Sequence, residues 1–459
     1  MIEVICGKEA YIYNAYHMVK AFYPAQEVAS RVEGKASNYV TVKLPDGTVA
    51  ADWIFTLYQA LCERTGRELA WGMLMGVRPT KLAMAKLEEG ACEDGFVSWF
   101  RESYLVSDEK ARLAWKIARR EKSLLDRIDR EDGYSLYIGI PFCPTVCTYC
   151  SFSSGALADW EGKVEGYLDA LCRELRAVAR MSAKKRLHTV YIGGGTPTTL
   201  HAVQMDRLLT CIDENFDRRY VVEYTVEAGR PDSITKEKLE VMRRHNVTRI
   251  SVNPQSMQKK TLEAIGRKHT VEDVYEAYRL ARAVGFDNIN MDLIAGLPGE
   301  ALADMEDTLA QIKALSPDSL TVHSLAIKRA AKMGQEKYGG ACADIGGMIR
   351  AAFKAAEEMG MEPYYLYRQK NIAGNFENVG YAKVDKAGIY NILIMEEKQS
   401  IIAAGAGAST KIVLKDPVAS PSNPNKKTTL MRLENVKAID AYIARVDEMI
   451  ERKGEWLWH

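Results

Sequence analysis

Six short apolar segments alternate with amphipathic stretches between residues 134 and 325. Each segment is rich in branched and aromatic side chains, which is typical of β-strands, and each stretch between them repeats its apolar positions with helical spacing. The predicted strands are residues 136–140, 189–193, 221–227, 249–253, 289–294 and 319–325. The predicted helices include residues 164–181, 236–245, 273–284 and 302–315.

This alternation predicts parallel strands joined by right-handed crossover connections. Six such units make an α/β fold, an open or partial (β/α)6 TIM-like barrel, in which ligands bind to the loops after the carboxyl ends of the strands. We place the barrel in residues 131–330. Residues 1–130 are expected to form an α+β domain of unknown role, within which residues 110–122 predict an amphipathic helix with a solvated charged face. Residues 331–459 are expected to extend the barrel on its substrate side.

One segment of this extension has two interpretations. Residues 362–371 mix aromatic side chains with Arg368 and Lys370. This mixture suits a flat ring that bears carboxylates, and it equally suits a strand that packs on the barrel with its polar edge in water. The rest of the extension predicts a helix, a small-residue strand, a loop and a closing amphipathic helix at residues 345–359, 401–409, 417–427 and 436–453.

The composition is that of an ordinary soluble globular protein. The chain has 459 residues, of which 47% are hydrophobic and 27% charged, and its net charge is +1. This balance does not indicate nucleic acid or an acidic membrane as a partner. The chain has no export-signal pattern at its start and no apolar run near the ~20 residues of a membrane span. We therefore expect a cytoplasmic protein.

Three of the nine cysteines crowd into eight residues directly after the first predicted strand. Cys143, Cys147 and Cys150 are spaced C-x3-C-x2-C, and no second cysteine or histidine pair follows, so the pattern fits a structural zinc site poorly. A four-iron cluster held by three cysteines leaves one iron open for a small-molecule chelate such as S-adenosylmethionine. Buried apolar thiols and a redox disulfide are the alternatives. The other cysteines are scattered singly, which suits a reducing compartment: Cys6, Cys62, Cys92, Cys172, Cys211 and Cys342.

Polar or glycine-rich motifs follow the other strands. Residues 193–197, with three glycines, let backbone approach a ligand closely, although a turn without function has the same pattern. Glu227 suits a cationic group or a ribose, and it suits a solvated turn as well. Asp292 lies inside an apolar strand and must be paired, because an unpaired buried carboxylate is expensive. A lone histidine such as His323 is more often a hydrogen-bonded core residue than a ligand.

The motifs together resemble those of a known family. YIGIPFCPTVCTYC, YIGGGTPTTL, RISVNPQS, IGRKHT and DLIAGLPG, in this order, are similar to the oxygen-independent coproporphyrinogen-III oxidase family of radical S-adenosylmethionine (SAM) enzymes. The segments YYLYRQKN and NFENVGYAK resemble its HemZ-type branch. The resemblance implies a [4Fe-4S] cluster, one SAM with room for a second, and a tetrapyrrole substrate whose propionates become vinyl groups in haem biosynthesis. It also implies a reducing partner such as flavodoxin or ferredoxin.

The resemblance carries roles to individual residues but implies no catalytic residue beyond the ligands of the cluster and of SAM. Cys143, Cys147 and Cys150 would hold the cluster. Tyr137, Gly194 and Glu227 would contact the SAM bound to it. The second SAM would contact Tyr149, Gly195, Thr196, Gln255, Arg267, Asp292 and Ala326.

The chain departs from the family pattern at two places. Gly139 stands where other members have a histidine, and Ser151-Phe152 stands where they have a further cysteine. A cysteine motif that ends in C-x-F, as this one does at residues 150–152, also occurs in the haem-chaperone branch of the family. Two alternatives to coproporphyrinogen dehydrogenation therefore stay open, namely a haem-binding transfer protein and a radical SAM enzyme that acts on another substrate.

Overall fold

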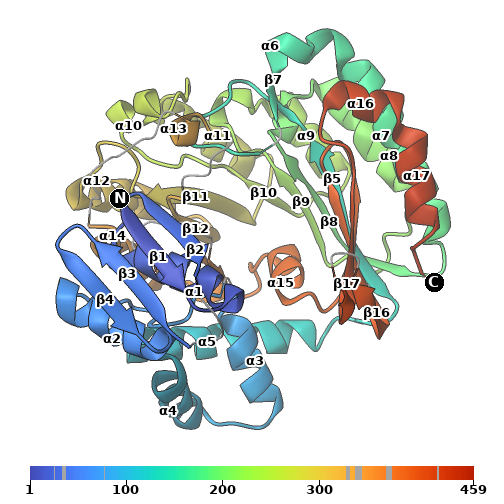
Figure 1. The fold of residues 1–459 in the computed structure, drawn as a ribbon. Coiled ribbons are helices and arrows are strands. Elements are labelled where there is room, and N and C mark those ends of the chain that lie inside the picture. The colour runs from blue at the N-terminus through green and yellow to red at the C-terminus, as the bar shows by residue number, and fades with distance from the viewer. Residues whose placement is uncertain are drawn as a thin grey trace.

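Six parallel strands, taken in chain order, form the middle of an eleven-stranded sheet that curves around a central space (Figure 1). Each of the six pairs in parallel with the next. The predicted partial (β/α)6 barrel is therefore confirmed. Its strands are β5 (Gly133–Ile140), β8 (Arg186–Gly194), β9 (Glu223–Glu227), β10 (Arg249–Ser251), β11 (Ile289–Ala295) and β12 (Ser319–Ser324).

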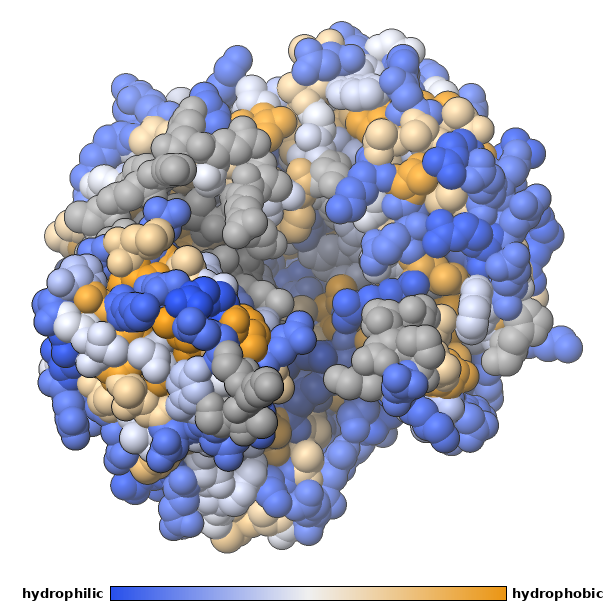
Figure 2. Space-filling model, in the orientation of Figure 1, coloured by the Kyte–Doolittle hydropathy of each residue, from blue (hydrophilic) through white to orange (hydrophobic). Residues whose placement is uncertain are grey.

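The structure is a computed structural model that describes most of the chain. One side of the molecule is hollowed between the N-terminal strands and the hairpin of β16 (Ser409–Ser420) and β17 (Asn423–Glu434) (Figure 2). Among the described residues, no helix combines the length and the apolar character that a membrane crossing requires. The described residues are 1–24, 26–33, 38–76, 78–152, 154–326, 331–335, 344–368, 375–420 and 423–458.

Helices cover the outer face of the parallel strands, and polar caps fix where some of them begin. In the capping box of α11, the Thr270 hydroxyl accepts the Asp273 N–H at 3.1 Å, and the Asp273 carboxylate accepts the Thr270 N–H at 2.7 Å. Almost all residues of the strands between these helices are buried, as expected of parallel strands that are covered on both faces. The helices are α7 (Val164–Met181), α8 (Ala202–Asn215), α9 (Lys236–Arg244), α11 (Val271–Ala283), α12 (Leu302–Leu315) and α14 (Ile345–Glu358).

Strands from the C-terminal region extend both ends of the sheet. β14 (Asn378–Ala382) and β13 (Glu362–Tyr367) add antiparallel strands beside β12. β15 (Ser400–Ala404) pairs in parallel with β5, and β16 (Ser409–Ser420) and β17 (Asn423–Glu434) follow as a long hairpin. The predicted loop at residues 417–427 is therefore wrong. The pairing shifts register between Val413 and Val418, and an irregular edge of this kind accommodates Pro417.

The helix α15 (Ile389–Glu396) lies inside the curve of the sheet (Figure 1). Its first N–H donates to the carboxylate of Glu223, the first residue of β9. The Tyr390 ring stacks on the Tyr191 ring with 4.3 Å between centroids, and Tyr137 stacks on Tyr390 at 6.3 Å. The amino-terminal half of the barrel interior is thus filled by this helix, and the carboxyl ends of the strands are left for ligands.

The turn after β15 lies directly on β5. Gly405 has a φ of +107°, and a Cβ atom there would lie 2.5 Å from the carbonyl oxygen of Gly139. The Tyr167 hydroxyl donates to that oxygen at 2.7 Å and accepts the Ala406 N–H at 3.0 Å. A Cβ atom at Gly139 would meet the Ala404 and Ala406 carbonyl oxygens at 3.6 and 3.8 Å, which is ordinary contact. The C-terminal extension therefore supports the strand that leads into the cysteines.

The first 65 residues form a four-stranded sheet with two helices and a hydrophobic core of their own. The helices α3 to α5 instead pack against the barrel core. The boundary at residue 130 remains a prediction, although this packing groups residues 80–125 with the barrel. The elements are β1 (Ile2–Cys6), α1 (Glu9–Phe22), β2 (Val28–Val32), β3 (Val40–Leu44), β4 (Gly47–Ala51), α2 (Ile54–Thr65), α3 (Thr80–Glu88), α4 (Glu93–Tyr104) and α5 (Asp108–Leu125).

The predicted solvated face of residues 110–122 is wrong at two positions. Lys110 is buried and pairs with Glu377 at 2.7 Å, and the indole N–H of Trp71 donates to the same carboxylate at 2.7 Å. Glu121 is fully buried as well, and burial together with the nearby Glu396 raises the pKa of its carboxyl. These two charged residues are buried rather than solvated, because α5 packs against β13 and α15.

Two short helices, α16 (Ile439–Ala444) and α17 (Val446–Gly454), replace the single closing helix that was predicted. Lys453 on α17 is buried and pairs with the buried Glu174 of α7 at 2.6 Å. Glu174 also accepts the Tyr442 hydroxyl at 2.6 Å and the Gly405 N–H at 2.9 Å. One carboxylate thus joins the last helix, α7 and the turn after β15.

We expect Lys453→Met to lower the free energy of unfolding by about 3 kcal/mol, because it leaves a buried carboxylate without its cation. The matched control is Arg173→Met, since Arg173 joins the same two helices to Asp447 at 2.9 Å on the surface. That change should cost less than about 1 kcal/mol. Urea unfolding of the two variants measures the difference, and equal losses would contradict the assigned role of Lys453.

Candidate functional site

The three predicted cluster cysteines lie on one loop that starts at the carboxyl end of β5. After Pro141, β6 (Phe142–Cys143) pairs with β7 (Gly155–Ala156), so the loop leaves and returns at the same place. Its middle is fixed by the Thr148 N–H, which donates to the Ile265 carbonyl at 3.1 Å. All three thiols are free of disulfides, and Cys147 is buried.

The glycine segment after β8 packs against this loop. The N–H groups of Gly195 and Thr196 donate to the carbonyls of Ile140 and Phe142, both at 2.7 Å. A Cβ atom at Gly195 would lie 2.5 Å from the Phe142 oxygen and 3.0 Å from the Cys143 sulfur. The Thr196 hydroxyl donates to that sulfur at 3.7 Å. Glycine is thus required at 195 by the approach of the cysteine loop.

Glu227 ends β9 beside the tyrosines of β5 and β8. Its carboxylate accepts the Tyr191 hydroxyl, and the rings of Tyr137 and Tyr191 stack with 6.2 Å between centroids. Burial raises the pKa of Glu227 to about 7, and the negative charge of Asp292 adds to the rise. Glu227 can therefore hold or release a proton near neutral pH. The alternative of a solvated glutamate in a turn does not fit this burial.

The loop after β10 presents polar atoms that lack partners. Gln255 has a φ of +67°, which is unusual for this residue type, and its backbone is fixed by Asp292, whose carbonyl accepts its N–H at 2.9 Å. Arg267 donates to the Asn253 carbonyl at 2.6 Å. Burial alone would lower the pKa of Arg267, but Tyr149 and Cys147 keep it above its ordinary value. The buried atoms without a partner are Asn253 Oδ1, Gln255 Oε1, Arg267 Nε and both ring nitrogens of His269.

Asp292 points into the barrel from β11 and is paired, as the sequence predicted. It accepts the Asn290 side-chain amide at 2.7 Å, and the His323 ring lies 3.7 Å away. Burial alone would raise the pKa of Asp292, but these two partners hold it below its ordinary value. Both ring nitrogens of His323 have protein neighbours, the Tyr367 hydroxyl at 3.2 Å and the Asp292 carboxylate, which agrees with the expected satisfied histidine, although the side chain is 26% exposed. Ala326, which is partly buried, follows the end of β12.

Of the two interpretations of residues 362–371, the contacts of Arg368 fit the strand that packs on the barrel. Its guanidinium is buried and donates to the Leu74 and Gly76 carbonyls and to Asn375. It lies over the Trp71 ring at 5.5 Å. The residue therefore fastens the N-terminal region to β13. Lys370, the other cation of this segment, lies outside the described residues.

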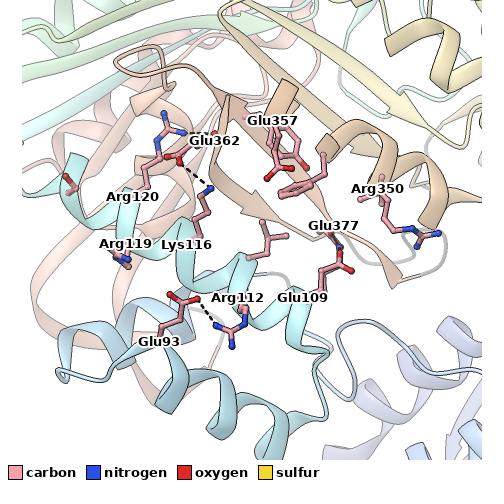
Figure 3. A pocket seen from close by; sticks show the side chains of 16 residues that line it. Glu93, Glu109, Arg112, Lys116, Arg119, Arg120, Arg350, Glu357, Glu362 and Glu377 are labelled. Atoms are coloured by element: carbon pink, nitrogen blue, oxygen red, sulfur yellow. Dashed lines mark hydrogen bonds and ion pairs between the residues drawn. The ribbon is translucent and has the colours of Figure 1, made fainter. Parts of the chain in front are cut away.

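A separate cavity of about 970 Å³ lies outside the barrel between α5, α14 and β14 (Figure 3). Several of its charges are paired with one another, including Arg112 with Glu93 at 3.1 Å and Lys116 with Glu362 at 3.3 Å. None of the predicted site residues lines it. The cavity is therefore distinct from the site at the strand ends.

The residues present fit an iron-sulfur cluster. Among the described residues, no three His, Cys, Asp or Glu side chains gather as the ligands of a single metal ion. A four-iron cluster instead binds each cysteine to a different iron, so it suits three thiols spread along one loop. The absence of a Cβ atom at Gly195 leaves space beside the Cys143 sulfur. The unpartnered polar atoms around Gln255 and Arg267 fit a polar ligand next to it.

Comparison with known proteins shows similarity to radical SAM proteins and to coproporphyrinogen-III oxidase-like proteins. The model of the radical SAM superfamily matches residues 137–312. The chain is 44% identical over 372 residues to the oxygen-independent coproporphyrinogen-III oxidase-like protein HemZ of Bacillus subtilis, covering 78% of this chain and 74% of that protein. It is 35% identical over 195 residues to the heme chaperone HemW of B. subtilis, covering 42% of this chain and 51% of the chaperone.

Two further comparisons involve Escherichia coli. The oxygen-independent coproporphyrinogen III oxidase of strain K12 is 32% identical over 208 residues, which cover 45% of each chain. The solved structure of coproporphyrinogen III oxidase (HemN), described as a radical SAM enzyme, superposes with a TM-score of 0.55 at 22% identity over 72% of this chain and 73% of that chain. This structural likeness supports the fold alone.

The sequence did not single out Thr145 and Arg230, which contact each other at the cysteine loop. Thr145 lies between two of the cysteines, and Arg230 follows β9 and donates to the Thr145 hydroxyl at 3.0 Å. Arg230 precedes a proline and has the pattern of an ordinary turn, so the sequence held no signal for this contact.

We expect Gly195→Ala to reduce cluster incorporation by about half or more, because an added methyl group collides with the Phe142 carbonyl and the Cys143 sulfur. Gly162→Ala is the matched control, since a Cβ atom there has no neighbour within 4 Å. Iron and sulfide per chain, measured after anaerobic reconstitution, test the prediction. Equal contents in both variants would contradict it.

Glu227 should make stability depend on pH. Its ordinary pKa of 4.5 rises to about 7 in the folded chain, so between these values the folded protein keeps a proton that the unfolded chain has lost. Stability therefore falls as pH rises through this window. We expect the wild type to lose about 2 kcal/mol relative to Glu227→Gln between pH 5 and pH 8.

Denaturant unfolding at several pH values measures this loss. The control is Glu240→Gln, which changes a glutamate that is 48% exposed on α9. The free energy of unfolding of Glu240→Gln should change with pH in the same way as that of the wild type. Parallel curves for the wild type and Glu227→Gln would show that Glu227 titrates normally.

Proposed function

Since this chain belongs to the oxygen-independent coproporphyrinogen-III oxidase-like family of the radical SAM superfamily, we propose that it oxidatively decarboxylates the propionate side chains of coproporphyrinogen III. The products would be vinyl groups, as in the formation of protoporphyrinogen IX. The observation that carries the proposal is the convergence of three free thiols and several unpartnered polar groups at one end of the barrel.

In this proposal Cys143, Cys147 and Cys150 hold a [4Fe-4S] cluster, and one iron stays free of protein ligands. When bound and reduced, the cluster and SAM would supply a 5'-deoxyadenosyl radical that takes a hydrogen atom from a propionate. Loss of carbon dioxide and transfer of the remaining electron to an external one-electron acceptor would then leave the vinyl group. The cysteine loop follows the carboxyl end of β5, the edge of the barrel at which a substrate would be oriented. A one-electron donor protein such as flavodoxin or ferredoxin would reduce the cluster.

The residues around the thiols would bind SAM. Tyr137, Gly194 and Glu227 would contact the molecule on the cluster, and Glu227 can do so in either protonation state near neutral pH. Asp292 stays ionised and so can attract a cationic group. A second SAM, if the substrate side holds one, would contact Tyr149, Gly195, Thr196, Gln255, Arg267, Asp292 and Ala326.

A haem-binding transfer protein is the second candidate. The match to the heme chaperone HemW and the Ser151-Phe152 ending of the cysteine motif favour it. Phe152 is 71% exposed beside the cysteine loop, which suits contact with a hydrophobic ligand or partner. The two candidates share the cluster and SAM and differ in whether a tetrapyrrole is changed.

An anaerobic assay with reductant, SAM and coproporphyrinogen III tests the proposal. We expect 5'-deoxyadenosine and vinyl product from the wild type, and at least ~100-fold less of both from Cys147→Ala, because the cluster loses a ligand. Cys92→Ala is the matched control, since Cys92 is exposed and far along the chain from the loop. Deoxyadenosine without vinyl product would reject the substrate, and stoichiometric haem binding without turnover would favour transfer.

A further inference from the structure

We propose that the Arg230–Asp232 ion pair positions the cysteine loop and sets the reduction potential of the cluster that the loop holds. The inference rests on the proposed cluster and goes beyond its ligands. It assigns a role to a pair of charges that lies outside the barrel interior and outside the residues implied by the family resemblance.

The pair is held in one geometry. Arg230 Nε and Nη2 donate to the two oxygens of Asp232 at 3.0 and 2.8 Å, a bidentate contact. The remaining terminal nitrogen, Nη1, donates to the Thr145 hydroxyl at 3.0 Å and to the Thr145 carbonyl at 3.3 Å. Thr145 lies midway between Cys143 and Cys147, and its hydroxyl also donates to the Gly266 carbonyl at 3.3 Å. The guanidinium thus binds the central residue of the C-x3-C segment.

The charges of the pair are poorly screened from the cysteines. Arg230 is 3% exposed and the Asp232 side chain 23% exposed. Interactions between charges at this depth persist at ordinary salt concentrations. The guanidinium contacts Thr145, which is two residues from Cys143 and from Cys147, so its charge acts on irons bound to these thiols. Net charge is one of the factors that set cluster potentials.

The segment that carries the pair does not need it for its own shape. The Thr198 hydroxyl donates to the Ala228 carbonyl at 3.1 Å, and it lies 2.6 Å from the Ser233 hydroxyl. The Lys238 ammonium donates to the Thr198 and Ser233 carbonyls at 2.6 and 3.0 Å. Residues 228–233 are therefore fixed to Thr198, just after the glycine segment, without the help of the Arg230–Asp232 pair. Burying an ion pair costs free energy. The side-chain hydrogen bonds that this pair makes to other residues go to Thr145 of the cysteine loop.

The two charges predict opposite effects, which a merely structural role would not produce. Arg230→Gln leaves an anion beside the cluster and should shift its midpoint potential to more negative values, because reduction adds a further negative charge. Asp232→Asn leaves a cation and should shift the potential to more positive values. Arg230→Lys keeps the charge and loses the bidentate geometry, so its potential should stay near the wild type while its iron content falls.

The test uses the full chain reconstituted anaerobically with iron and sulfide. The midpoint potential is measured by redox titration followed by electron paramagnetic resonance, iron per chain by analysis, and folding by circular dichroism. The control is Arg218→Gln, which breaks an Arg–Asp pair of 3.0 Å before the start of β9 and should leave the potential unchanged.

The outcomes separate this inference from the proposed function. Opposite shifts in Arg230→Gln and Asp232→Asn support it. Unchanged potentials, or shifts in the same direction, overturn it while the wild-type cluster stands. If Arg230→Gln does not fold, Asp232→Asn and Arg230→Lys still decide the sign of the effect. A wild-type chain that forms no cluster overturns the proposed function and this inference together.

Discussion

The arrangement of the site depends on the backbone contact between two neighbouring parallel strands just past their carboxyl ends. β5 and β8 stop pairing as strands, yet the N–H groups of Gly195 and Thr196 continue to bind the carbonyls of the segment that leads to Cys143. The contact is so close that no Cβ atom fits at position 195. The cysteine loop is therefore shaped by the sheet itself, and the side chains of Glu227, Gln255 and Asp292 reach the same edge because parallel strands end together.

The parts of the structure that repeat were predictable from the sequence. Periodicity gave the six strands and the helices between them, and the local spacing of Cys143, Cys147 and Cys150 indicated the cluster loop. Contacts between distant segments were not predictable. The hairpin of β16 and β17 contains Pro417, which reads as a loop, and only pairing along an irregular edge makes it a strand. Lys110 has the pattern of a surface residue, because the sequence does not show that Glu377 and Trp71 lie above it.

Buried polar contacts tie the appended regions to the barrel. Arg368 binds carbonyls of the N-terminal region, and Glu174 gathers Lys453, Tyr442 and Gly405. Each of these groups is costly to bury alone and is satisfied only when both regions are docked. These contacts favour one relative placement of the appended regions, and the helix α15 occupies the barrel interior between them (Figure 1).

The close contact of Gly405 with Gly139 makes the two positions unequal in the changes they tolerate. A Cβ atom at 405 would lie 2.5 Å from the Gly139 carbonyl oxygen, whereas a Cβ atom at 139 would meet the Ala404 and Ala406 carbonyl oxygens at 3.6 and 3.8 Å. A methyl group therefore fits at 139 but not at 405, where the positive φ also disfavours a side chain. The turn after β15 is thus the less mutable partner of this contact.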